Sequence, residues 1–532
     1  MVKRKREAKE QAAPAAKSRK SEQEKAPRSQ EAAANNTVTT SKKQTPTSET
    51  TNSAWVAETT IIQIVTGSYE RVLHGFTAAI PSTLITKPSP EPTETVTYTD
   101  NFLFNAHTSS IRCLALSPPT DDPNGRILLA SGSTDERINI YSLSLCPLLP
   151  KPNNSTAPSL PFLSKTAIAT NPKNKELGSL TQHASSITAL CFPSRSKLLS
   201  SSEDSTIAIT RTRDWEHLSS IKVPIPTPQG RPSGDTAAPG EVPSGVNDFA
   251  VHPSNRLMLS VSKGEKSMRL WNLVTGKKAG VLSFSREDLS AVGEGRMGTG
   301  EGRRVLWDPE GEEFTVGFER GAIVFGIDCK PRATIIPTPR TKIHQMAYLP
   351  AAGERTVLAL STEDGRIMFY DTGNTVSAPA SQQQNGKEKD AQKIGSCVLI
   401  SQLGGPAAGI TSRIKDFSII PIPSSESSTT AEKYLIVSAC SDGSVRLWVV
   451  DSGDVLGRKK KEDKKEKMAT TFTTNQVGRL IGTYANATRI TCLKAFVMTG
   501  KPEEGEVGVG AREDGAKESE SESEESSEED EE

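Results

Sequence analysis

The sequence lacks a run of about 18 apolar residues, the length that a membrane-spanning helix needs, and its first residues lack the apolar core of a signal peptide. We therefore expect a soluble, intracellular protein. Cysteines are few and scattered: there are seven, with no CxxC pair and no His nearby at ligand spacing. This pattern argues against a disulfide framework or a zinc site and indicates a reducing compartment.

Large apolar side chains are also scarce, since 34% of the 532 residues are hydrophobic, 5% are aromatic, and 34 residues are prolines. These figures predict one folded domain interrupted and flanked by solvated segments. The formal net charge is zero because 64 basic residues balance 64 acidic ones. The two signs are separated, however, and both ends of the chain read as interaction tails.

The basic tail covers residues 1–54, which are expected to be disordered because they have almost no large apolar side chains to bury. Its KRKR and KSRK clusters have the spacing of a two-part nuclear localisation signal, and a merely solvated tail is the alternative. The signal would consist of Lys3, Arg4, Lys5, Arg6, Lys17, Arg19 and Lys20. The expected location is the nucleus.

The acidic tail covers residues 501–532, also expected to be disordered, and it ends in ESESESEESSEEDEE. Alternating Ser and Glu suit acidophilic kinases, and phosphorylation would add further negative charge. Such a tail suits basic partners, for example ribosomal proteins or histones.

The body between the tails, residues 55–500, repeats one phrase, shown best by YLIVSACSDGSVRLWVV at 434–450. Its β-branched and aromatic runs suit half-buried strands, and Asp-Gly supplies the positive φ of a tight turn, so the phrase predicts a β-hairpin. The equivalent turns carry Asp135, Asp204, Asp364 and Asp442. Their separations are multiples of a unit somewhat longer than the ~40–45 residues of a WD repeat.

The excess length is predicted to lie in surface insertions at about 144–176, 222–244, 372–393 and 452–470, all rich in Pro, Ser, Gly, Gln or Lys. Six units are nearly complete. Residues 59–104 lack a first strand, which RITCLKAF at 489–496 would supply. The expected fold is therefore all-β, a seven-bladed WD-repeat β-propeller closed by N- and C-terminal strands that share one blade.

The repeat resembles the WD repeat, in which a His, a Ser or Thr, the turn Asp and a closing Trp form a buried hydrogen-bond network. A buried Asp needs such partners, because burial without them is costly. The fit is partial in every unit; for example, Ile410 takes the His position of the 434–450 unit, and Trp307 and Asp308 of a degenerate fourth unit fall outside the pattern. The residues expected to form structural networks are His107, Asp135, His183, Asp204, Asp364, Asp442, Trp271 and Trp448.

An alternative is a hydrolase triad of Ser131, His107 and Asp135. The sequence has no GxSxG elbow at this serine, and the pattern recurs in a second unit, which one active site would not require. We therefore expect no enzyme, no cofactor, no metal and no small-molecule substrate.

The run RKKKEDKKEK at 458–467 is expected to be a surface loop. Its mixed charge suits a solvated linker, and its basic residues equally suit sequence-independent contact with RNA phosphates. The possible RNA contacts are Arg458, Lys459, Lys460, Lys461, Lys464 and Lys465.

Several phrases are more specific than a generic WD repeat, among them IVTGSYERVLHGF, LGSLTQHASSITALCF and GRLIGTYANATRITCLKAFV. They resemble the maintenance-of-killer / PAK-interacting-protein family of WD-repeat proteins over roughly 59–500, insertions excluded. The Trp215–Glu216 pair after a third strand is a trait of that family.

The resemblance implies a non-enzymatic scaffold, monomeric within a larger nucleolar complex, that binds pre-ribosomal proteins and ribosomal RNA and supports maturation of large-subunit RNA. Animal members are also described as regulators of p21-activated kinases. A signalling adaptor that restrains such a kinase is therefore the alternative.

Overall fold

A computed structural model of the chain describes residues 59–86, 95–149, 168–226, 244–294, 298–376, 394–423, 431–456 and 475–504, apart from positions 121, 123, 124, 351, 354, 501 and 502. Contacts divide the chain into Met1–Asn52 and Ser53–Glu532, and all described residues belong to the second unit. No helix in these ranges is long and apolar enough to cross a membrane.

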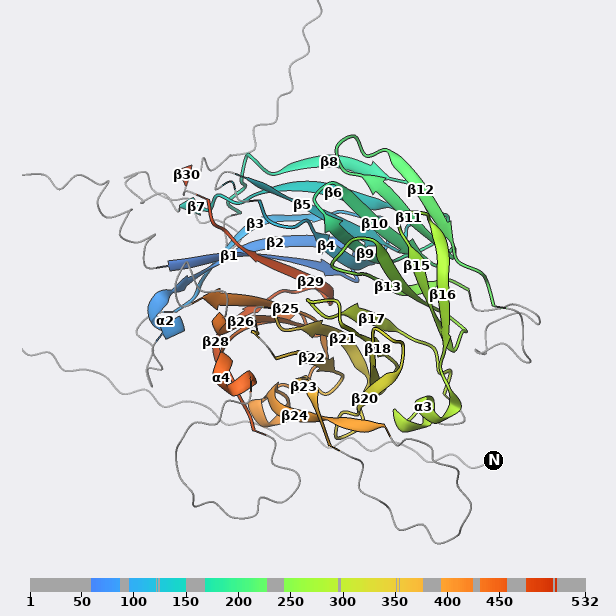
Figure 1. Cartoon of the computed structure of the whole chain (residues 1–532). Helices are drawn as coiled ribbons and strands as arrows, with labels where there is room; N and C mark the ends of the chain where they lie inside the picture. Colours follow the sequence, from blue (N-terminus) through green and yellow to red (C-terminus); the bar gives the residue numbers. More distant parts are fainter. Residues whose placement is uncertain are drawn as a thin grey trace, which may run out of the picture. The chain divides into compact units, whose positions relative to one another are not determined.

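The closing blade takes strands from both ends of the described chain. Its order from the inside is β29 (Ile490–Val497), β1 (Thr59–Ser68), β2 (Val72–Pro81) and β3 (Thr97–Asn105). β29 pairs antiparallel with β1 in a register that sets Ile64 opposite Ala495. In Figure 1 the red β29 accordingly joins the blue strands of the chain start. The predicted closure is confirmed.

Six further blades follow along the chain, each a four-stranded antiparallel meander. Blade 1 contains β4 (Ile111–Leu116), β5 (Arg126–Ser133), β6 (Ile138–Ser144) and β8 (Lys175–Leu180). Blade 2 contains β9 (Ile187–Ser194), β10 (Lys197–Ser202), β11 (Thr206–Arg211) and β12 (His217–Lys222). Blade 3 contains β13 (Val246–Val251), β14 (Leu257–Ser262), β15 (Ser267–Asn272) and β16 (Lys277–Ser283).

The other three blades come from the second half of the chain. Blade 4 contains β17 (Arg304–Trp307), β18 (Glu313–Gly317), β19 (Ala322–Gly326) and β20 (Pro331–Ile335). Blade 5 contains β21 (Ile343–Tyr348), β22 (Val357–Thr362), β23 (Arg366–Val376) and β24 (Gly395–Gly404). Blade 6 contains β25 (Ile414–Pro423), β26 (Ala431–Cys440), β27 (Ser444–Asp451) and β28 (Arg479–Ala485). The sequence phrases expected to form hairpins therefore do so, including the degenerate fourth unit.

The blades form a closed ring, because seven clusters of buried apolar side chains each lie between two neighbouring blades. Ile436 and Trp448 of blade 6 share one cluster with blade 5, whereas Leu435 and Leu447 share the next with the closing blade. Alternate residues of a strand point to opposite faces of the sheet, so each blade packs against both of its neighbours. The all-β seven-bladed propeller is confirmed.

The outer edges depart from independent blades in two places. β20 and β24 pair in parallel, which joins blades 4 and 5 into one eight-stranded sheet. β7 (Leu148–Leu149) pairs in parallel with β30 (Glu503–Glu504). β30 thus places a strand in the stretch expected to be a disordered acidic tail.

The edges of the expected insertions overlap secondary structure. The 144–176 range contains β7 and the start of β8, and the 372–393 range begins inside β23. The 452–470 range begins with α4 (Ser452–Val455). Two other short helices, α2 (Ser82–Thr86) and α3 (Arg286–Ala291), and the 3-10 turn η1 (Pro406–Ala408) lie between strands.

Candidate functional site

The network of blade 1 joins three buried side chains. His107 Nε2 lies 2.7 Å from Ser131 Oγ, and His107 Nδ1 lies 3.1 Å from Asp135 Oδ2. The backbone N–H of Thr108 donates to the same carboxylate at 3.0 Å. The network therefore fastens the loop before β4 to the turn between β5 and β6.

Blade 2 repeats this geometry. His183 Nε2 lies 2.8 Å from Ser200 Oγ, and His183 Nδ1 lies 3.0 Å from Asp204 Oδ2. Burial favours the protonated form of Asp204, but hydrogen bonds from His183 and Thr206 outweigh it and hold the carboxyl pKa far below its usual range. Asp135 and Asp204 are therefore both ionised, and each carboxylate lies within hydrogen-bond distance of a histidine ring.

The catalytic reading of Ser131, His107 and Asp135 conflicts with their burial. The three atoms have the order of a triad, but Ser131 is fully buried and His107 is 6% exposed. A nucleophile must reach its substrate, and this hydroxyl has no access to one. Burial also lowers the pKa of His107, although Asp135 opposes this effect. The arrangement serves the fold.

Blades 3 and 6 contain the other half of the WD pattern. The indole N–H of Trp271 donates to Ser260 Oγ at 2.8 Å, and that of Trp448 donates to Ser438 Oγ at 3.1 Å. Asp442 lies apart from Trp448 and instead accepts hydrogen bonds from the N–H and hydroxyl of Ser444 at 2.9 and 2.6 Å. The expected Asp442–Trp448 network is thus two separate contacts.

Asp364 of blade 5 pairs with a neighbour on the next strand instead of a histidine. Arg366 Nε donates to Asp364 Oδ2 at 2.7 Å, and the hydroxyl of Thr362 donates to Oδ1. The guanidinium therefore replaces the imidazole as the partner of the turn carboxylate.

Two buried aspartates on inner strands were missed by sequence reasoning. Asp248 Oδ2 accepts the N–H of Val305 at 3.1 Å, and Asp416 Oδ2 accepts the N–H of Leu493 at 2.8 Å. Each carboxylate thereby joins its inner strand to the neighbouring inner strand. The phrases VNDF and IKDF share an Asp-Phe pair at equivalent positions, and this recurrence is the signal that could have revealed them.

A second buried network joins the closing blade to blade 6. His74 Nε2 lies 3.0 Å from Asp100 Oδ1, and the hydroxyl of Tyr484 donates to the same oxygen at 2.7 Å. The Tyr484 ring also stacks on Phe76, with centroids 4.2 Å apart. These contacts hold the N-terminal strands against β28.

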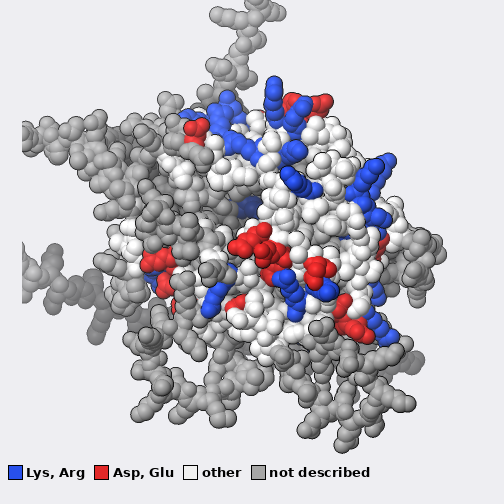
Figure 2. All heavy atoms as spheres, viewed as in Figure 1, with Lys and Arg blue, Asp and Glu red and all other residues white. Residues whose placement is uncertain are grey.

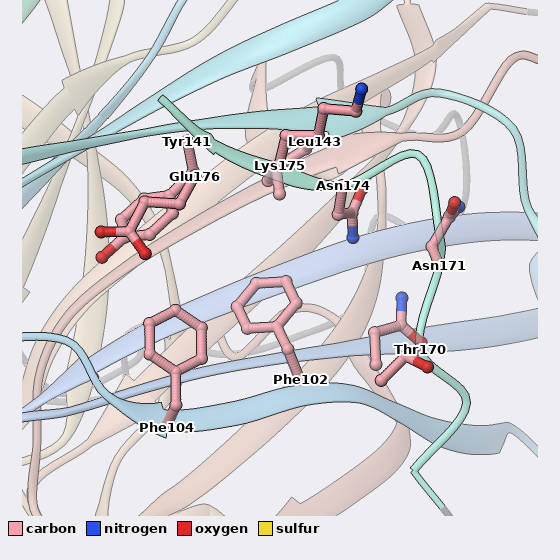
Figure 3. A pocket seen from close by; sticks show the side chains of 10 residues that line it. Phe102, Phe104, Tyr141, Leu143, Thr170, Asn171, Asn174, Lys175 and Glu176 are labelled. Carbon is pink, nitrogen blue, oxygen red and sulfur yellow. The ribbon is translucent and has the colours of Figure 1, made fainter. Parts of the chain in front are cut away.

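An aromatic groove lies between the closing blade and blade 1 (Figure 3). It is a cavity of about 300 Å³, and the rings of Phe102 and Phe104 on β3 point across it towards Tyr141 and Glu176. Phe104 is 37% exposed, and its ring centroid lies 5.7 Å from that of Tyr141. An aromatic cavity whose edge is exposed to solvent suits a protruding apolar side chain of a protein partner.

Two groups of proposed site residues lie outside the described residues. They are the nuclear-signal residues within 1–20 and the possible RNA contacts within 458–467. In the part of the chain that the structure describes, no three His, Cys, Asp or Glu side chains are grouped so that they could hold a metal ion.

The ring of four-stranded blades and the His–Ser–Asp networks define a WD-repeat β-propeller, a class of protein-interaction scaffold. The family model described as "WD domain, G-beta repeat" matches residues 98–142 and 174–210. These stretches contain the two complete His–Ser–Asp networks.

Comparison with known proteins gives similarities that cover most of the chain. The chain is 27% identical to Protein MAK11 of Saccharomyces cerevisiae over 404 residues, 73% of this chain and 77% of that protein. It is 25% identical to the p21-activated protein kinase-interacting protein 1-like of Gallus gallus over 459 residues, 86% of this chain and 87% of that protein. The human p21-activated protein kinase-interacting protein 1 is 25% identical over 390 residues, 73% of this chain and 70% of that protein. The chain is thus similar over most of its length to MAK11 and to the vertebrate p21-activated protein kinase-interacting proteins, and the resemblance inferred from the sequence is confirmed.

Proposed function

We propose that the chain is a non-enzymatic scaffold in nucleolar assembly of the large ribosomal subunit. In this role it binds pre-ribosomal proteins and RNA and supports maturation of large-subunit RNA. The observation that carries the proposal is the similarity to Protein MAK11 over 73% of the chain, together with the family phrases of the sequence. The nucleolar role itself comes from the family resemblance.

The surfaces of the propeller support a scaffold. The aromatic groove of Phe102, Phe104 and Tyr141 is open to a partner's side chain, whereas the His–Ser–Asp networks are closed. Contact with RNA is assigned to the basic run at 458–467, where phosphate charge would dominate affinity. Nucleolar residence is assigned to the basic clusters within residues 1–20 together with binding to the particle.

Depletion of the protein from its own cells tests the proposal. Large-subunit RNA precursors should accumulate, and the ratio of large to small subunits in a sucrose gradient should fall. Re-expression of the wild-type chain should restore both. Unchanged precursors and a normal subunit ratio after complete depletion would remove the ribosomal role.

Rescue variants separate the parts of the chain. A chain lacking residues 1–20 should enter the nucleus less efficiently; continued nucleolar retention would show that the particle holds it. Phe104→Ala should rescue poorly if the groove docks a partner, whereas Val274→Ala, at a 75% exposed position on the turn after β15, should rescue fully.

The second candidate is a signalling adaptor that binds and restrains a p21-activated-type kinase. The names of the vertebrate relatives favour it, since they describe proteins that interact with such a kinase. This function predicts cytoplasmic residence, normal ribosomal RNA and direct binding of the purified chain to the kinase. Binding that lowers kinase activity, without a precursor defect on depletion, would establish it over the ribosomal role.

A further inference from the structure

The inner strands of all seven blades surround a central channel. A cavity of about 670 Å³ is lined by residues of β4, β9, β13, β17, β21, β25 and β29. A second cavity of about 340 Å³ adjoins it and shares Arg112, Thr188 and Arg304 with it. Figure 2 shows a hollow near the centre of the described part, with Lys or Arg atoms inside it.

Basic side chains gather where several inner strands begin. Arg304 is the first residue of β17, His344 and Lys415 are the second residues of β21 and β25, and Arg489 directly precedes β29. We call these four residues the basic mouth. Each comes from a different blade, so the ring itself brings together charges that are far apart in the sequence.

Carboxylates near the basic mouth are already engaged. Glu319 is shared by Lys342 at 2.7 Å and Arg303 at 3.4 Å, and Glu363 pairs with Arg413 at 3.4 Å. Asp248, the nearest carboxylate to Arg304 at 3.9 Å, accepts two backbone N–H groups. Few carboxylates are therefore left for the mouth itself.

Three groups of the basic mouth have unused bonding capacity. Among the described residues, Lys415 has no carboxylate within ion-pair distance, and neither has Arg489, whose guanidinium lies 5.6 Å from the centroid of the Tyr69 ring. His344 Nε2 is buried without a hydrogen-bond partner in that same part of the chain. A buried polar atom of this kind costs free energy unless something bonds to it.

The electrostatics agree with this geometry. Burial, together with the smaller effects of the charges on Lys415, Arg413 and Arg304, lowers the pKa of His344 to about 4. Burial also lowers the pKa of Lys415, and Arg413 and Arg489 contribute to the shift. Arg304 and Lys415 line the central cavity, His344 lines the adjoining one, and Arg489 is exposed at a distance from which its charge still acts on Lys415. Like charges gathered in this way repel one another, and a bound anion would relieve this repulsion.

We propose that the basic mouth binds a small molecule carrying several phosphate groups. Arg304, Lys415 and Arg489 would each donate to phosphate oxygens, and a protonated His344 Nε2 would supply a further donor. The carboxylates of Glu203, Glu319 and Glu363 follow β10, β18 and β22 and stand around the opening. Each of them is paired with a basic side chain, so the choice of ligand rests on shape. A central cavity of about 670 Å³ fits a compact ligand better than an extended RNA strand or acidic peptide.

Titration calorimetry on the purified full-length chain tests the site, with inositol hexakisphosphate and inorganic tripolyphosphate as probes. The expected result is one high-affinity site per chain. Lys415→Gln should weaken it by about tenfold, the loss that follows from removing one charge-assisted hydrogen bond. Arg304→Gln combined with Lys415→Gln should weaken it further. Lys277→Gln, on the exposed outer strand β16, is the matched control and should leave affinity unchanged.

The basic runs at 1–20 and 458–467 could also bind the probes. Two further measurements therefore distinguish binding at the basic mouth from binding at these runs. Histidine-selective NMR should show the pKa of His344 rising when the probe is present, which binding elsewhere would not cause. Lys415→Gln should raise the thermal unfolding midpoint of the ligand-free protein, because it removes repulsion between like charges. The same variant should lower the affinity for the probe.

Equal affinity of the Lys415→Gln and Lys277→Gln variants, or no effect of either probe on His344, would overturn the proposal. So would binding confined to a single-stranded RNA or a polyglutamate peptide, since either would mean another class of ligand. None of these results would affect the ribosomal role, which the depletion experiment tests separately.

Discussion

His107 Nδ1 lies 3.1 Å from Asp135 Oδ2, and this contact links the loop that enters blade 1 to the central turn of the same blade. The distance along the chain is 28 residues. The pair therefore fixes where β4 begins relative to β5 and β6. The equivalent pair, His183 and Asp204, does the same in blade 2.

Replacement of His107 by Ala should destabilise the fold. The change removes the partner of a carboxylate that is 6% exposed in its side chain and leaves Ser131 Oγ without its imidazole. We expect a loss of about 2–3 kcal/mol in the free energy of unfolding, measured by urea denaturation.

The matched control is His217→Ala, because His217 lies exposed on the outer strand β12. It should change stability by less than about 0.5 kcal/mol. Equal losses in the two variants would show that the buried network contributes nothing specific.

Gly443→Ala should also destabilise, for a backbone reason. Gly443 has φ of 86°, and an added Cβ would collide with the carbonyl oxygen of Asn486. Both left-handed strain and steric overlap act here, so we expect a loss of about 3 kcal/mol. Gly276→Ala separates the two effects, since Gly276 has φ of 66° but open space around its Cβ position.

The loss for Gly276→Ala should be about 1 kcal/mol, which is the strain alone. Thermal and urea unfolding of both variants provide the measurement. If Gly443→Ala lost no more free energy of unfolding than Gly276→Ala, the result would contradict the close approach of the β26–β27 turn to the chain after β28.

The sequence was sufficient to predict the blades because each hairpin is a local feature. Alternating β-branched residues around an Asp-containing turn predict strand, turn and strand without knowledge of neighbours. The split blade could also be predicted, since a strand without a partner at one end of the repeats matched a gap at the other.

The contacts between blades could not be predicted in the same way. Asp248 reaches Val305, and Glu313 of blade 4 accepts from the Thr372 hydroxyl of blade 5 at 2.7 Å. Nothing local marks such partners, because they meet only when the ring closes. The basic mouth has the same origin, since Arg304 and Lys415 stand on separate strands whose own phrases, RRVLW and IKDF, show one or two charges each.

Stability should depend on pH through His344. Burial lowers the pKa of its imidazole to about 4 in the folded state, whereas an unfolded His has a pKa of about 6.5. The unfolded state therefore binds the proton more readily, and stability falls as the pH drops from about 6.5 towards 4. Solvent screening limits the loss to the order of 1–2 kcal/mol.

His344→Gln should reduce this loss, and His217→Gln should leave it in place; urea denaturation at pH 7.5 and pH 4.5 measures both. The hydrogen-bonded aspartates affect the stability of the fold at a lower pH than His344 does. Because hydrogen bonds depress the pKa of Asp135, Asp204 and Asp442 below their unfolded values, their contribution is present above about pH 4 and is lost only as the pH falls further. A stability profile of His344→Gln identical to that of the wild type would contradict the buried, neutral state of this imidazole.

Replacement of tryptophans by Phe should distinguish the indoles that hold a blade together from the one that does not. Trp448 and Trp271 donate to Ser438 and Ser260, whereas the buried Nε1 of Trp307 has no partner among the described residues. All three variants lose similar ring contact, so the difference between them isolates the hydrogen bond. We expect Trp448→Phe and Trp271→Phe to lose about 1 kcal/mol more in the free energy of unfolding than Trp307→Phe does. If Trp307→Phe proved the most damaging of the three, the indole hydrogen bonds of Trp448 and Trp271 would not be what distinguishes these tryptophans.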